Sequence, residues 1–421
     1  MSRRAALLVT ADGEVFTGYA ALTDPLVKAT TDHPVIVGRA DVAGPTESSD
    51  CPRGRGPGLV AVLGRKPGTR PPSGPGNDLD GRARQVYVPG AAGPGRPRAF
   101  ATATPVRSSV REVRWVLERF VESEEPVFHG YVAMTDGAAH LEGPESLAAT
   151  MQVLDREIER IRREHPEMEF HAVIYSDHGI SGGPKLVNVR EGVEAVLQRA
   201  GYRLNGRLDS GRDVVMVPFG LVSSFEAYVL PGDGPGLART LAKAPGVDLC
   251  VARLEPGSSW LVAGGDGEGE AVVERRREGG TSLWRYRSAD GEAGGDPLEY
   301  LPVIERFHRE IGFSETAWLP DDVWFSLTWD HLYPDALYRL ARTFDLVLHP
   351  ASAVCSVEPG YMYGAAITDW AARLTTGHLR WTHGALHAPS SYGFLLTDVP
   401  GWQPPPALRF DEALVDFLGD R

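Results

Sequence analysis

Histidine and aspartate recur at three places in this sequence in arrangements that could hold a metal ion. Asp136 is followed four residues later by His140, with only small residues between them. Asp177 and His178 are adjacent, and both His178 and His383 precede a glycine. Carboxylate oxygens and neutral imidazole nitrogens are ligands that suit Zn²⁺ and Mn²⁺. The five residues together therefore predict a metal site.

Each motif also has a purely structural interpretation. A histidine at a strand end is more often a hydrogen-bonded structural residue than a ligand, and Asp with Gly is favoured in turns. Gly179 would then permit a sharp reversal of the chain after His178. The metal site is favoured because all three motifs lie beside predicted strands and follow one another in order.

The first two motifs follow apolar runs that we interpret as buried strands. Residues 127–134 form the first run, and Asp136 and His140 would follow it in a tight turn. Residues 170–176 form the second run, which ends at Asp177. The motif around His383 precedes a last predicted strand at residues 392–396.

Amphipathic helices are predicted between these strands. Residues 107–121 and 147–163 carry apolar side chains at helical spacing. Further helices are expected at 190–200, 298–311 and 334–343, and further strands at 214–219, 227–230, 249–254 and 345–349. This alternation favours an α/β fold, namely a doubly wound, mostly parallel sheet with helices on both faces. In such sheets, ligands bind at the carboxyl ends of the strands.

Two segments rich in glycine divide the chain. Residues 44–98 are dominated by Gly and Pro, and we interpret them as a surface insertion or linker. Residues 1–43 would be an N-terminal part of the α/β domain, shortened by a truncated start. Residues 99–421 would form a metal-binding α/β core, with a second insertion or mobile hairpin at about 264–296. The first insertion is locally basic, which indicates a solvated linker or else a loop that attracts polyanions; its basic residues are Arg53, Arg55, Arg65, Lys66, Arg70, Arg82 and Arg84.

The composition excludes several classes of protein. The 421 residues include 43 Lys and Arg against 56 Asp and Glu, a net charge of −13. This balance argues against binding of duplex nucleic acid and against a polybasic membrane anchor. No apolar run approaches the roughly 20 residues of a membrane-spanning helix. The widely spaced Cys51, Cys250 and Cys355 argue against a disulfide framework or a cysteine zinc site, and favour a cytoplasmic protein. The alternative is an exported protein whose N-terminal signal is missing from the sequence.

In their order and spacing, the motifs resemble the alkaline phosphatase-like superfamily of metallohydrolases, especially its nucleotide pyrophosphatase/phosphodiesterase branch. That family has an Asp-x-x-x-His motif, then Ser-Asp-His-Gly at the next strand end, and Thr/Ser-His-Gly near the C-terminus. The matching segments here are Asp136-Gly-Ala-Ala-His140, Ser176-Asp177-His178-Gly179 and Thr382-His383-Gly384. The resemblance extends from about residue 107 to the C-terminus.

The resemblance implies two divalent metal ions, Zn²⁺ in the first place, with Mn²⁺ or Mg²⁺ as alternatives. Asp136, His140 and His383 would hold one ion, and Asp177 and His178 the other, together with an N-terminal Asp and a Thr or Ser nucleophile. Two cations about 3.5–4 Å apart stabilise both the attacking and the leaving oxygen of a displacement at phosphorus. The implied function is hydrolysis of phosphate mono- or diesters, with a small-molecule phosphate ester or a nucleotide as substrate.

Ligand histidines bind metal ions as neutral rings and hold their second nitrogen against an acceptor. Glu142 and His387 lie close to the predicted ligands in the sequence. We expect for each either such an outer contact or a position at the surface.

The N-terminal motif of the family is not found in this sequence. Asp12 follows an apolar run and could be the missing ligand, but Asp12-Gly13 is also a hairpin signal, and we favour the hairpin. A sulfatase with a modified cysteine is excluded because Pro52 directly follows Cys51. The alternative function is a catalytically inactive member that binds a metal or a phosphorylated ligand. Candidate nucleophiles, none in a distinctive setting, are Thr30, Thr31, Thr46, Ser48 and Ser49.

Overall fold

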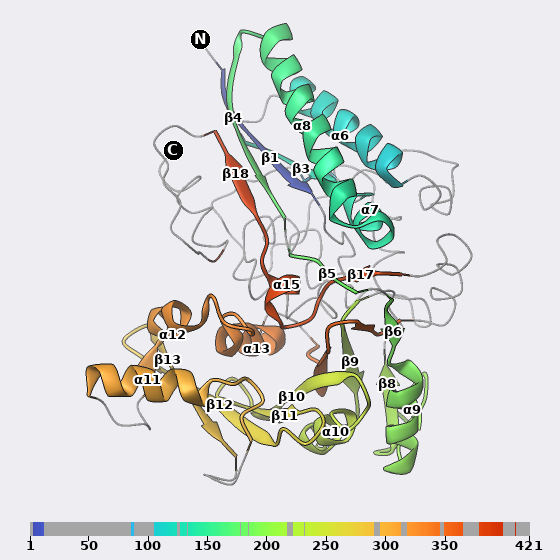
Figure 1. Ribbon diagram of the computed structural model, residues 1–421, viewed down its shortest axis with the longest axis vertical. Coiled ribbons are helices and arrows are strands. Elements are labelled where there is room, and N and C mark those ends of the chain that lie inside the picture. The colour runs from blue at the N-terminus through green and yellow to red at the C-terminus, as the bar shows by residue number, and fades with distance from the viewer. Residues whose placement is uncertain are drawn as a thin grey trace.

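The computed structural model contains two large sheets at opposite ends of the molecule, with the short strands β5 (Ser181–Gly182) and β17 (Trp381–Thr382) between them (Figure 1). It describes residues 3–11, 86–87, 105–123, 127–132, 134–176, 178–183, 185–216, 222–230, 232–289, 295–312, 318–345, 349–364, 379–398 and 409. The candidate nucleophiles and the basic residues of the predicted insertion lie outside these ranges.

The first sheet has five strands, in the order β18-β4-β1-β3-β2. Its central strand, β1 (Arg3–Ala11), runs parallel to β3 (Val127–Val132) on one side and to β4 (Met168–Tyr175) on the other. At the edges, β2 (Val86–Tyr87) pairs in parallel with β3, and β18 (Leu395–Thr397) pairs antiparallel with β4. The carboxyl ends of β1, β3 and β4 therefore lie at one edge of this sheet.

Two long helices pack together against this sheet, α6 (Pro105–Glu122) and α8 (Pro144–Glu164). Phe120 of α6 makes edge contacts with Phe128 and Phe170 of the sheet, at centroid distances of 5.6 and 4.9 Å. Leu154 and Ile158 of α8 are buried in the same core. The apolar spacing in the sequence predicted both helices correctly.

The second sheet has nine strands, and all neighbours are antiparallel except the last pair. In spatial order they are β14 (Leu319–Pro320), β13 (Thr281–Ser288), β12 (Glu270–Glu278), β11 (Ser259–Gly264), β10 (Val247–Glu255), β15 (Ala353–Val357), β9 (Ser224–Tyr228), β8 (Asp213–Met216) and β7 (Arg203–Leu204). Strands β12 and β13 form a hairpin whose Val273 and Trp284 are buried in the core of this sheet.

Helices cover both faces of the nine-stranded sheet. Leu249 and Val251 of β10 face a core that also contains residues of α11, α12 and α13, whereas Cys250 and Ala252 face a core with α9 and α10. The remaining elements are α7 (Met134–Glu142), α9 (Arg190–Arg199), α10 (Gly234–Leu241), α11 (Leu301–Ile311), α12 (Asp321–Thr328), α13 (Ala336–Asp345), α15 (Ala388–Ser391), β5 (Ser181–Gly182), β6 (Val187–Asn188), β16 (Tyr361–Met362) and β17 (Trp381–Thr382). Among the described helices, none combines the length and apolarity needed to cross a bilayer.

The α/β class is thus confirmed, whereas a doubly wound, mostly parallel sheet is not: the described strands form a largely parallel sheet of five and a largely antiparallel sheet of nine. The predicted strands near residues 214–219, 227–230 and 249–254 exist as β8, β9 and β10, but they lie in the antiparallel sheet. A strand buried on both faces is a continuous apolar run in either kind of sheet, so that the run does not disclose the strand direction. A strand was also predicted at residues 345–349. Asp345 is instead the last residue of α13, and residues 346–348 lie outside the described ranges.

Cys250 and Cys355 stand opposite each other on β10 and β15 and are joined by a disulfide bond. Both side chains are completely buried. The expectation against disulfides was therefore wrong for this pair. The two cysteines are 105 residues apart, and only the pairing of their strands brings them together.

The disulfide predicts the number of reactive thiols. Unreduced protein in denaturant should show one thiol of its three cysteines, and reduced protein all three. Reduction should also destabilise the fold by up to about 5 kcal/mol, because a cross-link over a loop of this length restricts the unfolded chain. Thiol titration and urea unfolding, with and without reductant, measure both effects. A Cys51→Ser variant is the control and should show no thiol before reduction; three thiols in unreduced wild-type protein would contradict the bond.

Candidate metal centre

Asp136 and His140 lie one turn apart on helix α7, not in the tight turn that we predicted. The spacing places both side chains on one face of the helix, and His140 Nε2 is 3.2 Å from Asp136 Oδ1. Helix α6 holds the start of α7 in place, because the Met134 N–H donates to Glu112 Oε2 at 2.6 Å. The Ser109 hydroxyl also donates to the Met134 carbonyl at 2.9 Å. The pair is thus presented directly after β3, at the carboxyl edge of the five-stranded sheet.

His178 follows β4 at the same edge and is buried. Its Nδ1 is 2.8 Å from the carbonyl oxygen of Gly179. Because a carbonyl only accepts hydrogen bonds, Nδ1 carries the proton and Nε2 has the lone pair that a metal ion requires. Gly179 is needed for close packing: a Cβ there would lie 2.3 Å from the Pro389 carbonyl oxygen. Asp177 lies outside the described residues.

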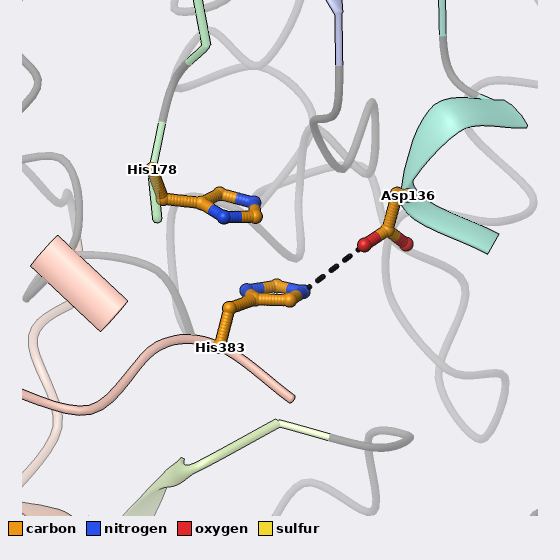
Figure 2. A group of neighbouring side chains, drawn as sticks. All are labelled: Asp136, His178 and His383. Atoms are coloured by element: carbon orange, nitrogen blue, oxygen red, sulfur yellow. Dashed lines mark ion pairs between the residues drawn. The ribbon is translucent and has the colours of Figure 1, made fainter. Parts of the chain in front are cut away.

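His383 reaches the site from the far end of the chain. It directly follows β17, which pairs antiparallel with β5, the strand that begins three residues after His178. The rings of His178 and His383 are stacked, with centroids 3.9 Å apart and planes inclined by 13°. Figure 2 shows the two rings one above the other and His383 directed toward Asp136. His383 Nε2 is 3.3 Å from Asp136 Oδ1.

The structure therefore brings four of the five predicted residues together. Asp136, His178 and His383 each offer a ligand atom, and these atoms lie within 4.8 Å of one another. His140 approaches Asp136 from the same helix, and its ring centroid is 5.0 Å from that of His383. Within the described ranges this is the only group of His, Cys, Asp or Glu with such spacing.

The donor set suits a divalent cation. In a tetrahedral site with bonds of about 2.0–2.1 Å, neighbouring ligand atoms lie about 3.3 Å apart. The Asp136 oxygen lies 3.2 Å from the His140 nitrogen and 3.3 Å from the His383 nitrogen. Both of these carboxylate–imidazole separations thus match the distance between neighbouring ligands of such an ion.

The protonation states also suit a cation. Burial alone would raise the pKa of the Asp136 carboxyl, but His140 and His383 hold that pKa well below its usual value. Burial and the neighbouring His178 lower the pKa of His383 to about 4. At neutral pH the site therefore presents an ionised carboxylate and a neutral imidazole, the forms that bind metal ions.

Sequence reasoning did not identify the role of the Trp381 backbone. His140 Nδ1 is 2.9 Å from the Trp381 carbonyl oxygen, so that this nitrogen carries the proton and Nε2 faces Asp136. A backbone carbonyl leaves no signature in a sequence. The adjacency of Trp381 to the motif at Thr382 was the one signal present.

Of the two residues considered for outer contacts, Glu142 is exposed at the end of α7. His387 is 2% exposed and precedes α15. Burial and the nearby Arg339 guanidinium lower the pKa of His387 to about 4. His387 is therefore an interior group that stays neutral down to acidic pH.

The structure contradicts the hairpin that we favoured at Asp12. Residues 6–10 of β1 pair in parallel with β3 on one side and with β4 on the other. Both edges of the strand are occupied, so that no antiparallel hairpin partner can pair with it. Asp12 itself lies outside the described residues and follows the last residue of β1 in the sequence.

Fold and site together define a mixed α/β protein with a carboxylate–imidazole centre at the carboxyl edge of a largely parallel sheet. The model of the family described as Type I phosphodiesterase / nucleotide pyrophosphatase matches residues 60–225. This match agrees with the resemblance of the motifs to the nucleotide pyrophosphatase/phosphodiesterase branch of the alkaline phosphatase-like proteins. The matched region includes four of the five predicted ligands, all except His383. No curated protein matches the sequence significantly.

Three solved structures with similarity to this chain are of ectonucleotide pyrophosphatase/phosphodiesterase 5. The murine protein is 11% identical, with a TM-score of 0.30, and the human protein 12%, with 0.31; each match covers 73% of this chain and 58% of the other. An inactive variant of the murine protein in complex with AMP is 10% identical, with a TM-score of 0.35, over 99% of this chain and 95% of the other. With TM-scores below 0.5, these superpositions do not establish a common arrangement of the whole chain.

The lowered pKa of His387 predicts a loss of stability in acid. Its folded pKa of about 4 lies below the ordinary value of 6.5, so the unfolded state binds the proton first. The contribution of the neutral His387 to the free energy of unfolding is complete above pH 6.5. It is lost as the pH falls from there toward the folded pKa of about 4. Between about pH 7.5 and about pH 5, the linkage amounts to about 2 kcal/mol.

Urea unfolding of the metal-free protein at several pH values measures this effect. The His387→Gln variant should lose less stability than wild type over this interval, because its side chain does not titrate. His165→Gln, at a partly exposed histidine after α8, is the control and should retain the wild-type pH dependence. Equal slopes for wild type and His387→Gln would show that His387 does not remain neutral.

Proposed function

We propose that this chain is a two-metal-dependent hydrolase of phosphate mono- or diesters. The observation that carries the proposal is the position of Asp136 Oδ1, which lies 3.2 Å from His140 Nε2 and 3.3 Å from His383 Nε2. The family match supports a phosphoric ester hydrolase, and its description as a nucleotide pyrophosphatase supports a nucleotide as substrate. Neither the number nor the identity of the ions follows from the match; the proposal of two ions, with Zn²⁺ first, comes from the donor set and the motifs.

The proposed first ion is held by Asp136, His140 and His383. The proposed second ion is held by His178 and Asp177, together with Asp12. This last assignment is supported by topology, because Asp12 follows β1 in the sequence, and β1 lies between the strands that precede the other ligands. The nucleophile is proposed to be one of the N-terminal hydroxyl residues Thr30, Thr31, Thr46, Ser48 and Ser49.

When bound, such ions neutralise the phosphoryl oxygens and lower the pKa of the nucleophile. The contribution of the protein is to hold its donors ready before the ions arrive. The ionised Asp136 and the neutral His383 need not release protons at neutral pH. The Trp381 carbonyl, as acceptor for His140 Nδ1, keeps Nε2 directed toward Asp136. Because little covalent chemistry is required of the protein in phosphoryl transfer, this positioning is its main task.

The compartment is proposed from the cysteines. A buried disulfide between Cys250 and Cys355 favours an oxidising environment. We therefore propose the exported form rather than the cytoplasmic one that the cysteine spacing indicated.

The proposal predicts metal-dependent turnover that is lost with the ligands. The wild-type protein should contain bound divalent metal and hydrolyse bis(4-nitrophenyl) phosphate or 4-nitrophenyl phosphate; a chelator should abolish the activity and added Zn²⁺ restore it. His178→Ala and His383→Ala should each lose metal and at least about 100-fold in activity, because the loss of a ligand exceeds the usual 10–100-fold cost of an outer contact. Elemental analysis and a chromogenic assay measure both.

His165→Ala, remote from the centre on the C-terminal side of α8, is the matched control and should retain metal and activity. Full metal content in both His178→Ala and His383→Ala would contradict the metal centre. Metal that binds to wild type and is lost in the variants, without hydrolysis of either ester, would favour the inactive, ligand-binding alternative.

A further inference from the structure

The Trp381 side chain lies where three parts of the candidate centre meet. The Trp381 residue belongs to β17, two residues before His383, and pairs with Gly182 of β5. Its carbonyl oxygen is 2.9 Å from His140 Nδ1 on α7, a contact over 241 positions of sequence. One residue thus contacts or adjoins the segments that carry His140, His178 and His383.

The indole ring is seated against two glycines from different elements. A Cβ at Gly182 would lie 2.2 Å from the Trp381 ring, and one at Gly143, directly after α7, would lie 2.4 Å from its Nε1. Real Cβ atoms do not approach other atoms this closely, so the ring occupies the space that side chains would otherwise fill. Gly143 also has a φ of +80°, a conformation that L side chains rarely adopt. The ring therefore fixes the separation between the end of α7 and β5.

The opposite side of β17 is fixed independently. The Ser223 hydroxyl donates to the Thr382 hydroxyl at 3.0 Å, and the Ser223 N–H donates to the His383 carbonyl at 2.6 Å. With the backbone held on that side, movement of the indole would displace the Trp381 carbonyl relative to α7, and with it the acceptor of His140.

We propose that Trp381 is a positioning residue of this centre: its indole, seated between Gly143 and Gly182, sets the place of the carbonyl that holds His140 toward Asp136. The proposal rests on the proposed function for the metal that the centre binds. The contacts of Trp381 with Gly143, Gly182 and His140 do not depend on a bound metal. The role of Trp381 can therefore also be tested in metal-free protein.

The chain offers adjacent glycines as variant and control. Gly182→Ala places a methyl group inside the indole, whereas a Cβ at Gly183 has as its nearest neighbour the Gly360 Cα at 3.6 Å, an ordinary contact. Gly182→Ala should raise the dissociation constant for Zn²⁺ about 10-fold or more, the usual size of an outer-contact effect. Gly183→Ala should bind as wild type. Competition with a chromogenic chelator measures both, and the melting temperature of each metal-free variant shows whether it is folded.

Relief of the clash separates positioning from general destabilisation. In a Trp381→Phe background the smaller ring leaves room for the methyl group, so adding Gly182→Ala should cost clearly less metal affinity than it does in wild type. Equal losses in the two backgrounds, or wild-type affinity in both Gly182→Ala and Trp381→Phe, would overturn the proposal. This comparison also remains decisive where one single variant folds poorly, because the double variant is measured against Trp381→Phe.

The tautomer of His140 provides a readout that needs no metal. In ¹⁵N spectra of metal-free protein labelled at its 12 histidines, the His140 signal is identified by its loss in His140→Gln. Wild type and Gly183→Ala should show the proton on Nδ1, and Gly182→Ala should show a mixture of tautomers. An unchanged tautomer in Gly182→Ala would overturn the role of Trp381. Wild-type protein that shows the Nδ1 tautomer and binds no Zn²⁺ would instead overturn the proposed function and leave the positioning of His140 supported.

Discussion

The candidate centre depends on the backbone pairing of β5 with β17. The paired residues of these two-residue strands lie far apart in the sequence, Ser181 opposite Thr382 and Gly182 opposite Trp381. Because β5 closely follows His178 and β17 directly precedes His383, the pairing determines how the two imidazoles meet. It also joins the two halves of the molecule, since β4 leads from the five-stranded sheet into β5, and the Ser223 N–H, directly before β9 of the nine-stranded sheet, donates to the His383 carbonyl.

Burial is the second constraint, and it acts in opposite directions on the two kinds of ligand. An imidazole removed from water resists protonation, which keeps His383 neutral, whereas a carboxyl group removed from water resists ionisation. Asp136 remains ionised because His140 and His383 lie within 3.3 Å of its oxygen. The low pKa of Asp136 therefore depends on the close approach of α7 and β17.

The sequence predicted the parts of the fold that local pattern determines. The 3.6-residue spacing identified α6 and α8, and apolar runs identified β3 and β4, because both patterns reflect burial on one element. The approach of His383 to Asp136 followed from the order of motifs at strand ends. The pattern could not reveal that Asp136 and His140 lie on a helix, since a spacing of four fits a helix and a turn alike, and Gly137 lowers the helix propensity between them. It also could not reveal the antiparallel sheet or the Cys250–Cys355 pair, which depend on long-range strand order.

The sequence at Asp12 shows why a local signal yields to topology. An Asp-Gly pair after an apolar run indicates only that the chain can turn there at low cost. This local conformational preference is worth about 1 kcal/mol at most. Strand β1 pairs with β3 on one side and with β4 on the other, so that its backbone groups are hydrogen-bonded along most of its length. A hairpin is excluded because it would need one of these two edges. The same residue types suit a loop that leaves the carboxyl edge of a parallel sheet, where ligand-binding residues are found. The hairpin signal and the ligand motif are therefore one local pattern, and only the partners of β1 distinguish them.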